Sequence, residues 1–172
     1  MPSTMMHTPL GVATLLRFGA RHFPDSRIAD YNGTELDWRS YSDVLAMAGQ
    51  IANGLSGLGI ASGDRVATFA WNSSEHLAFY LGIPGMGAVM HTLNCRLAPE
   101  QIAYIINHAD DRVIFVDGRL EAQFAPVLGL IDRVSTIIVS DPQGQLDDPR
   151  VIELQAWLSA HQEAYNLSLI HI

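Results

Sequence analysis

Two glycine-rich runs are the residues that most directly suggest nucleotide chemistry. They read GLSGLG, from Gly54 to Gly59, and GIPGMG, from Gly82 to Gly87. Phosphate is bound where a strand turns into a helix, because the first amide hydrogens of the helix and its positive dipole end point outward there. Both runs instead lie where a helix is expected to end and a strand to begin. We therefore interpret them as helix-stop and close-packing glycines.

Histidine and cysteine side chains are the other candidates for chemistry. His76, His91 and His108 fall on a predicted helix, a strand end and a helix end, with no short spacing that would aim two imidazoles at one metal ion. We expect packing or surface roles for them. Cys95 adjoins Arg96, which could lower its pKa, but no base is evident nearby, so an inert, partly buried thiol is favoured. The sequence indicates no catalytic, cofactor-binding or metal-ligating residue.

The run Trp71-Asn72-Ser73-Ser74 follows a predicted strand, on the side where ligands bind in open α/β sheets. It has no glycines to admit a phosphate and no nearby lysine. N-capping by serine is the favoured interpretation, and a supporting contact to an active site outside this chain is the alternative. The carboxylate pairs Asp110-Asp111 and Asp147-Asp148 are expected to be solvated loop charges.

The elements that would position these residues follow from hydrophobic spacing. Asn32-Gly33 predicts a β-hairpin because both residues tolerate positive φ, and Ser40 is a good helix N-cap. The pattern predicts an α/β fold, namely a mainly parallel sheet with flanking helices and an N-terminal β-hairpin. Strands are predicted at 65–70, 89–92, 113–116 and 134–139, helices at 40–59, 73–81, 99–109, 120–130 and 151–160, and a surface loop at 142–149.

Composition limits the class of protein. The chain has 172 residues, of which 48% are hydrophobic and 16% charged, and a net charge of -8. This balance fits one globular unit and argues against nucleic acid as a partner. A single cysteine fits a reducing compartment, and we expect a cytoplasmic protein. The longest uncharged run is shorter than the roughly 20 residues needed to span a bilayer, so no transmembrane segment is expected. Residues 14–23, with Arg17 and Arg21, are better explained as a docking helix than as a transit peptide.

The stretch from Trp71 to Asp117 carries a family resemblance. Its segment PGMGAVMHTLNCRLAPEQIAYIINH resembles the early part of bacterial medium- and long-chain fatty acyl-CoA ligases, in the adenylate-forming (AMP-binding) superfamily. Residues 36–44 and 85–97 are similar to the first two conserved adenylation motifs, which are scaffold motifs. Cys95 is a departure, because the family often has proline or an aliphatic residue there. The resemblance covers roughly residues 10–157 and implies part of the first subdomain of the acyl-CoA synthetase large domain.

The resemblance implies a reaction for the intact parent. A fatty acid and ATP, assisted by Mg2+, form an acyl-adenylate and pyrophosphate, and CoA then displaces AMP to give the thioester. A homodimer through the N-terminal region is also implied. The phosphate loop, the residues that hold adenine and ribose, the hinge and the adenylation lysine would lie beyond residue 172. We therefore expect residues 1–165 to be an incomplete synthetase domain that is inactive alone and binds none of these cofactors. Acyl chain length is not readable, because aryl-CoA ligases share the scaffold.

The last residues differ in character from the rest. LSLIHI, residues 167–172, can be encoded by DNA that resembles a transposase end used to tag sequencing libraries. We expect residues 166–172 to be a non-native tail, with a natural terminal strand as the alternative. Two other functions stay open at this point. One is a stand-alone, non-catalytic α/β interaction or ligand-binding module, and the other, less favoured, is a Rossmann oxidoreductase, which would need a fingerprint after the first parallel strand.

Overall fold

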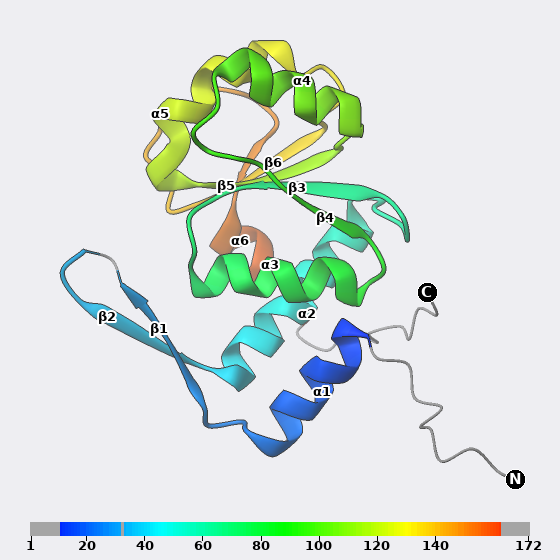
Figure 1. The fold of residues 1–172 in the computed structure, drawn as a ribbon, viewed down its shortest axis with the longest axis vertical. Coiled ribbons are helices and arrows are strands. Elements are labelled where there is room, and N and C mark those ends of the chain that lie inside the picture. Colours follow the sequence, from blue (N-terminus) through cyan, green and yellow to red (C-terminus); the bar gives the residue numbers. More distant parts are fainter. Residues whose placement is uncertain (1–10, 32, 163–172) are drawn as a thin grey trace, which may run out of the picture.

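The computed structural model describes residues 11–31 and 33–162, and Figure 1 shows their arrangement. The chain begins with a helix and an antiparallel hairpin, then alternates strands with helices. The elements are α1 (Val12–His22), β1 (Arg27–Tyr31), β2 (Leu36–Ser40), α2 (Tyr41–Gly57), β3 (Arg65–Phe69), α3 (Ser74–Gly85), β4 (Val89–Thr92), α4 (Pro99–Ala109), β5 (Val113–Asp117), η1 (Gly118–Leu120), α5 (Glu121–Phe124), η2 (Ala125–Leu130), β6 (Thr136–Ser140), β7 (Val151–Glu153) and α6 (Leu154–Ser159).

The main sheet has five strands in the order β4-β3-β5-β6-β7, and every neighbouring pair is parallel. In its register, Val66 of β3 lies opposite Met90 of β4 on one side and Val113 of β5 on the other. The hairpin β1-β2 forms a separate antiparallel sheet. The predicted α/β class, parallel sheet and N-terminal hairpin are therefore confirmed.

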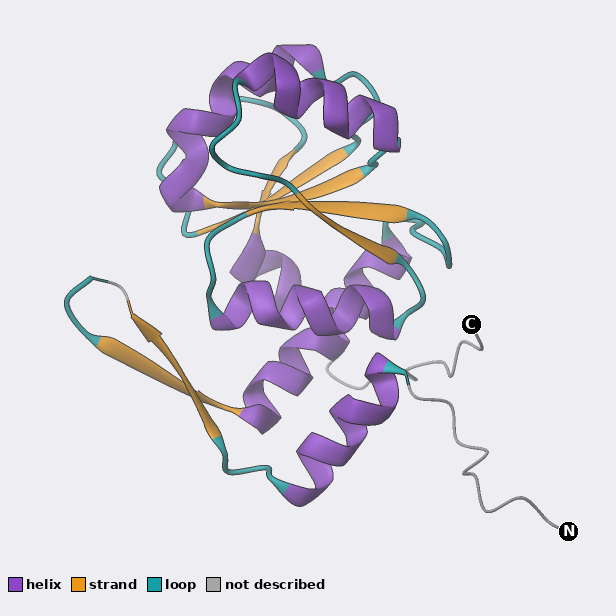
Figure 2. Cartoon of the chain, in the orientation of Figure 1, coloured by secondary structure: helices purple, strands orange, loops and turns teal. Residues whose placement is uncertain are grey.

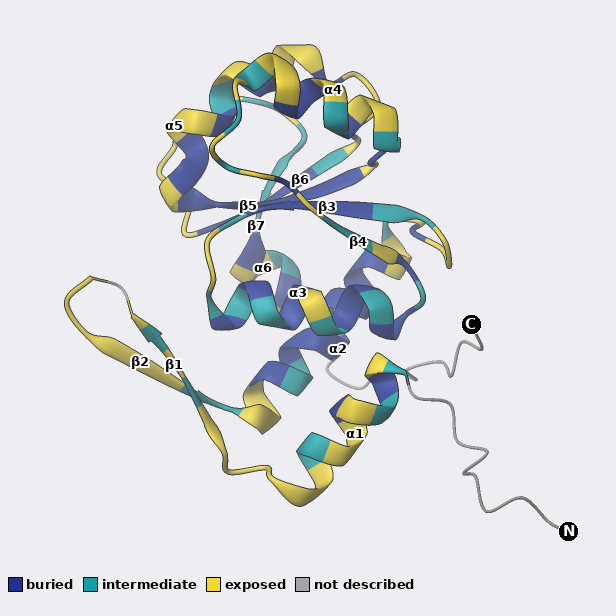
Figure 3. Ribbon diagram, viewed as in Figure 1, coloured by how far each residue is buried: buried dark blue, intermediate teal, exposed yellow. Residues whose placement is uncertain are grey.

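Helices cover both faces of the main sheet, so that the molecule has three layers (Figure 2). Alternate residues of β5 face opposite layers: Phe115 packs with α2, α3 and α6, whereas Ile114 packs with α4 and the η1–η2 segment. Every residue of β5 is buried, as expected for a central strand whose apolar run is continuous (Figure 3). Because all the strand pairs are parallel, the carboxyl ends of the strands lie at one edge of the sheet.

Three element predictions need correction. Residues 151–160 are not one helix, because Val151–Glu153 adds a fifth parallel strand to the sheet before α6 begins. Val151 and Ile152 are β-branched, and the Glu153 carboxylate accepts from the N–H groups of Gln155 and Ala156, which starts the helix at that point. The predicted helix at 120–130 is broken into α5 and η2, with Pro126 at the start of η2. The helix after Ser73 continues to Gly85 rather than stopping near residue 81.

The glycine runs have the structural roles expected of them. Gly59 and Gly87 follow the ends of α2 and α3 with φ of 80° and 90°, a conformation that glycine adopts without steric cost. Gly82 allows α3 to approach α2 closely, because a Cβ there would lie 2.7 Å from the Ala48 carbonyl oxygen. Neither run opens a helix, which is the position that a phosphate-binding loop needs.

None of the helices in the described ranges combines the length and apolar character needed to span a bilayer. The predicted non-native tail, 166–172, lies outside the described residues.

Candidate functional site

The strand order changes direction at β3, and this point defines the candidate site. The chain passes from β3 to β4 on one side and then to β5 on the other. In open α/β sheets, ligands bind outside the carboxyl ends of the strands at such a switch point. Here a polar cavity of about 260 Å³ lies at those ends, and its walls come from β1, β2, the β3–α3 turn and the ends of β5 and β6.

Asp117, the last residue of β5, is the central group of this cavity. Its carboxylate accepts hydrogen bonds from Arg119 Nε at 2.9 Å and Nη2 at 2.6 Å, and from the backbone N–H of Arg119 at 3.0 Å. It also accepts from the backbone N–H of Trp71 across the switch point, at 3.4 Å. Burial alone would raise the pKa of Asp117, but the Arg119 guanidinium and the backbone donors outweigh it, and the pKa lies below its usual value. Asp117 therefore stays ionised and ties β5 to the turn after β3.

Asp30 attaches the hairpin to the same edge. Its carboxylate accepts from the backbone N–H of Ser74 at 2.7 Å and from the Ser74 hydroxyl. Next to it, Glu75 lies 3.8 Å from Arg39 of β2 and accepts from Gln155 Nε2 at 3.1 Å. Burial raises the pKa of Glu75, and Arg39 opposes this shift. These contacts connect β1, β2 and α6 to the first turn of α3.

The serine-rich turn before α3 has the capping role that the sequence predicted. The Ser73 hydroxyl oxygen accepts from the backbone N–H of His76 at 3.1 Å, so Ser73 is the N-cap. His76 is buried, with Nδ1 3.1 Å from the Trp71 carbonyl oxygen and Nε2 3.0 Å from Thr68 Oγ1. Desolvation lowers the pKa of His76, which favours the neutral ring. His76 therefore packs beneath the turn, as expected.

The aspartate pair after α4 was only half correctly predicted. Asp110 is half-exposed and pairs with Arg133 at 2.7 Å, but Asp111 is fully buried, so the expectation of a solvated charge is wrong there. Asp111 Oδ2 lies 2.7 Å from His91 Nδ1 of β4. Burial raises the pKa of Asp111, and His91 counteracts the shift. The αL conformation of Asp110, with φ of 59°, ends α4 and turns the next carboxylate inward.

The second aspartate pair also departs from a solvated loop. Asp147 is exposed, but the side chain of Asp148 is 14% exposed and binds Arg150 in a bidentate pair at 2.8 Å and 2.8 Å. Arg150 also donates to the carbonyl oxygens of Ile131, Val134 and Leu128. The Arg150 hydrogen bonds lower the pKa of Asp148 to about 2. This pair fixes the segment before β7 to the end of η2.

The remaining predicted candidates lie apart from the cavity. His108 stacks on Tyr104 on α4, with ring centroids 5.7 Å apart. Cys95 is partly buried, and burial raises the pKa of its thiol, which agrees with an inert role. Among the described residues, no group of three His, Cys, Asp or Glu side chains could hold a metal ion.

Two residues that shape the loops beside the cavity carry no motif that would identify them in the sequence. Glu121 is buried and accepts from the backbone N–H groups of Gln143 and Gln145, which fixes the loop after β6. Gly118 lies so close to the end of β6 that a Cβ would be 2.2 Å from the Ser140 carbonyl oxygen. The available signal was positional, because Asp117 directly follows the strand predicted at 113–116 and precedes an arginine by two residues.

The arrangement does not fit a nucleotide phosphate at this edge. The cavity is lined by five carboxylates against two guanidinium groups, those of Arg39 and Arg119, and the N–H groups of Trp71 and Arg119 already donate to Asp117. A phosphate would need free donors and a positive surface. The hydrogen bonds and ion pairs of this site hold the hairpin, the β3–α3 turn and the ends of β5 and β6 in one arrangement.

The fold, and a switch point whose polar side chains mostly bind one another, define an α/β scaffold unit. Comparison with known proteins identifies its family: the model for AMP-binding enzymes matches residues 16–165, and the chain belongs to that family. It is 39% identical over 149 residues to a long-chain-fatty-acid--CoA ligase of Thermus thermophilus, covering 84% of this chain and 28% of the relative. It is 37% identical over 142 residues to a 3-methylmercaptopropionyl-CoA ligase of Ruegeria pomeroyi, covering 80% of this chain and 25% of the relative.

Solved structures agree with this assignment. A Mycobacterium tuberculosis fatty acyl CoA synthetase superposes with a TM-score of 0.68 at 28% identity, covering 92% of this chain and 30% of that protein. The anthranilate CoA ligase AuaEII superposes with a TM-score of 0.80 at 20% identity, a similarity of fold, over 95% of this chain and 30% of that one. The chain thus spans between a quarter and three tenths of the length of these proteins.

Proposed function

We propose that this chain is the N-terminal portion of an ATP-dependent fatty acyl-CoA ligase. The observation that carries the proposal is the 39% identity to a long-chain-fatty-acid--CoA ligase over 84% of this chain, together with 32% identity to a medium-chain-fatty-acid--CoA ligase of Ectopseudomonas oleovorans over 81%. In the proposed reaction, the fatty acid carboxylate attacks the α-phosphorus of ATP and pyrophosphate leaves. The CoA thiol then attacks the acyl carbon of the adenylate and AMP leaves, which gives the thioester.

A fatty acid is the proposed substrate class, although other relatives carry names that refer to other acids. One is a 3-hydroxybenzoate--CoA ligase of Aromatoleum, 32% identical over 60% of this chain. The two fatty-acid ligases match over a longer part of the chain, which supports the aliphatic assignment. ATP, Mg2+ and CoA are proposed for the intact ligase, which we place in the cytoplasm, with no nucleic acid as a partner.

The proposed role of residues 1–165 is to support the catalytic portion. Three carboxylates at the switch point, those of Asp117, Glu75 and Asp30, are already engaged by Arg119, Arg39 and Ser74 respectively. Catalysis needs donors organised in advance around the developing charge. We therefore expect the 172-residue chain alone to be inactive and to bind none of the three cofactors.

The test is to clone the reading frame beyond residue 172 from the source DNA. The extended protein and the 172-residue chain are then assayed side by side. The extended protein should release pyrophosphate with ATP, Mg2+ and a fatty acid and should form the CoA thioester, whereas the 172-residue chain should do neither. Benzoates are the control substrates. If the extended protein prefers benzoates to fatty acids, the fatty-acid assignment is wrong. Turnover by the short chain would contradict its supporting role. A true stop codon soon after residue 172, with no Pro-Lys phosphate loop, would favour the stand-alone binding module instead.

A homodimer through the N-terminal region is part of the same proposal. The exposed side chains of the projecting hairpin, Tyr31, Leu36 and Trp38, support it, because a two-stranded hairpin is marginally stable alone in water. Light scattering on the extended protein should give twice the monomer mass. A monomeric mass at micromolar concentration would remove the dimer from the proposal.

A further inference from the structure

The hairpin β1-β2 leaves one edge of β1 open. Among residues 11–31 and 33–162, β2 is the only strand that pairs with β1. The backbone N–H of Tyr41 donates to the Ser26 carbonyl oxygen at 2.8 Å, so these residues form a hydrogen-bonded pair at the start of the ladder. Hydrogen-bonded and non-hydrogen-bonded pairs alternate along an antiparallel ladder. The register therefore directs the backbone N–H and C=O groups of Ala29 and Tyr31 away from β2, toward the open edge.

A groove of about 550 Å³ runs along this edge, between β1 and the start of α3. Residues 28–31 of β1 form one wall, and Ser73, Leu77 and Tyr80 are among the residues of the other. The hairpin projects from the molecule on the side where α3 begins (Figure 1). The register of β1 is unbroken by a bulge and the strand contains no proline, so two common devices that block an edge are missing here.

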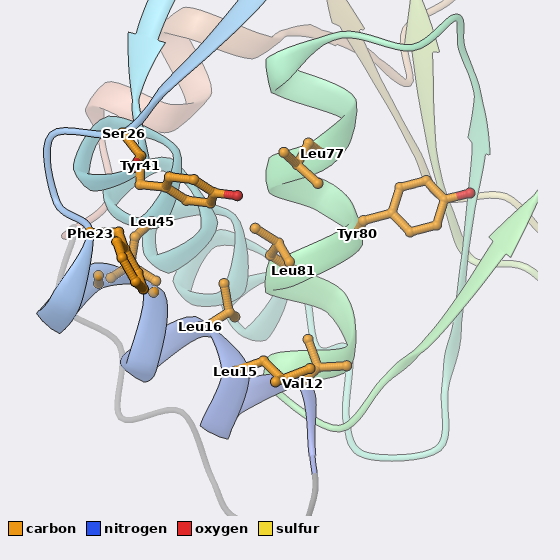
Figure 4. Close-up of a pocket in the computed structure, with 12 residues that line it drawn as sticks. Val12, Leu15, Leu16, Phe23, Ser26, Tyr41, Leu45, Leu77, Tyr80 and Leu81 are labelled. Carbon is orange, nitrogen blue, oxygen red and sulfur yellow. The ribbon is translucent and has the colours of Figure 1, made fainter.

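The backbone edge distinguishes this groove from a second one. A groove of about 700 Å³ lies between α1, α2 and α3, and Leu77 and Tyr80 line both grooves (Figure 4). The walls of the second groove come mainly from helices, whose backbone groups bond within each helix, so it offers side-chain contacts. The groove beside β1 also offers backbone donors and acceptors in a row. That combination is the one by which an exposed sheet edge takes up an extended strand.

The shape of the groove selects a single strand over a second copy of the hairpin. Paired strands lie about 4.8 Å apart, and α3 closes the groove on the side away from β1. A second copy that offered either edge of its hairpin would carry the other strand of that hairpin into the space occupied by α3. The occupant is therefore a strand that has no neighbouring strand on its far side.

We propose that an extended strand from the part of the ligase that follows residue 172 adds to β1 in this groove. The inference rests on the proposed function, in which most of the ligase lies outside this chain, because the chain covers 28% of the Thermus relative. Gln162, at the end of the described chain, accepts a hydrogen bond from Asn53 Nδ2 of α2 at 2.6 Å. Gln155 Nε2 of α6 donates to Glu75, in the first turn of α3, at 3.1 Å. The polypeptide that follows therefore starts from the layer of helices that borders the groove.

The groove also defines the chemistry of the added strand. Its N–H and C=O groups pair with those of Ala29 and Tyr31, and its alternate side chains that face Leu77 and Tyr80 are apolar. A third strand stabilises a hairpin that is marginal in water on its own. Pairing at the edge leaves the outer side-chain face of the hairpin, which carries Trp38, available for the proposed dimer.

The test is hydrogen–deuterium exchange, read residue by residue, on the 172-residue chain and on the extended protein. The amides of Ala29 and Tyr31 should exchange at least about 10-fold more slowly in the extended protein, which corresponds to about 1.4 kcal/mol of added protection. The amide of Trp38 faces the outer edge of β2 and is the internal control, which should exchange at similar rates in both proteins. Equal rates at Ala29 in the two proteins, or slowing at Trp38 instead, would overturn the proposal.

A pair of variants tests the backbone contact itself. Ala29→Pro removes the N–H that the added strand would use, and proline is tolerated where an edge strand directs its N–H outward. In the extended protein this variant should return Tyr31 to fast exchange. Ala29→Gly keeps the N–H and is the matched control, so Tyr31 should stay slow there. Circular dichroism on both variants of the 172-residue chain verifies the fold, and slow exchange at Tyr31 in a folded Ala29→Pro protein would contradict strand addition.

Ligase assays on the same extended protein separate this inference from the proposed function. An active ligase with fast exchange at Ala29 would refute the added strand and leave the ligase assignment in place. Slow exchange at Ala29 in a protein without ligase activity would support the strand and refute the ligase. Protection of Ala29 that appears in the 172-residue chain as its concentration rises would assign the edge to a second copy and overturn the proposal.

Discussion

Gly118→Ala tests whether the carboxyl edge of the sheet is as tightly packed as the structure indicates. A Cβ at this position would lie 2.2 Å from the carbonyl oxygen of Ser140 and 2.3 Å from that of Asp141. Both atoms belong to the backbone, and Ser140 is held in register opposite Asp117, so neither can yield by a side-chain rotation. Overpacking of this kind typically costs about 1–3 kcal/mol. For a chain of this size, that loss lowers the melting temperature by about 2–12 °C.

The assay is urea unfolding followed by circular dichroism, with the midpoint as the readout. Gly19→Ala is the matched control, because a Cβ there meets no atom within 4 Å and the residue lies inside α1. Alanine at such a site should be neutral or should stabilise the helix by about 0.5–1 kcal/mol. If Gly118→Ala unfolds at the wild-type midpoint, the close approach of β5 to the end of β6 is wrong. If both variants lose stability equally, the effect comes from alanine itself and not from packing.

Three further predictions concern charges and the chain end. Because the pKa of Asp148 is about 2 in the folded protein, below its ordinary value of 3.8, its ion pair with Arg150 should stabilise the fold above about pH 4. That contribution should be lost as the pH falls toward 2, so the difference between wild type and Asp148→Asn in urea should shrink over this window. His91→Ala leaves the Asp111 carboxylate buried without its hydrogen-bond partner and should cost about 1–3 kcal/mol at neutral pH. Burial raises the pKa of Asp111, so this penalty should decrease as acid protonates the carboxylate, and a penalty independent of pH would contradict a buried, ionised Asp111. Deleting residues 167–172 should leave the urea midpoint unchanged, and a loss above about 1 kcal/mol would show that the tail belongs to the fold.

The core of the fold was predictable because local signals and burial agree. The run Val113–Val116 is continuous and apolar, and the structure places it at the centre of the sheet with both faces covered. Ser40 caps α2 as expected, and its hydroxyl accepts from the N–H of Asp43 at 3.1 Å. Strand β7 was missed because three residues carry too little pattern, and its pairing with β6 depends on residues more than ten positions away.

The contacts of the candidate site were less predictable for a related reason. Asp111 looks like half of a solvated pair in the sequence, and only the αL turn at Asp110 and the position of His91 in β4, twenty residues earlier, make it buried. Likewise, Asp30 and Ser74 are separated by 44 positions, and their hydrogen bond depends on where the hairpin projects. Sequence spacing reports the neighbours within one element, whereas these partners are set by tertiary packing.

Helix α6 has a consequence for how the protein is made. Trp157 closes over Gly54 of α2, where a Cβ would lie 2.2 Å from the indole, and Gln50 Nε2 donates to the Leu158 carbonyl oxygen. The layer that α2 begins is thus completed by residues translated about a hundred codons later. During synthesis from the ribosome, α3 can cover most of the apolar face of α2, but the part around Gly54 and Gln50 stays open until α6 has emerged. Nascent chains arrested before that point should be sensitive to proteolysis and should recruit chaperones, and protection should appear abruptly once Trp157 leaves the exit tunnel.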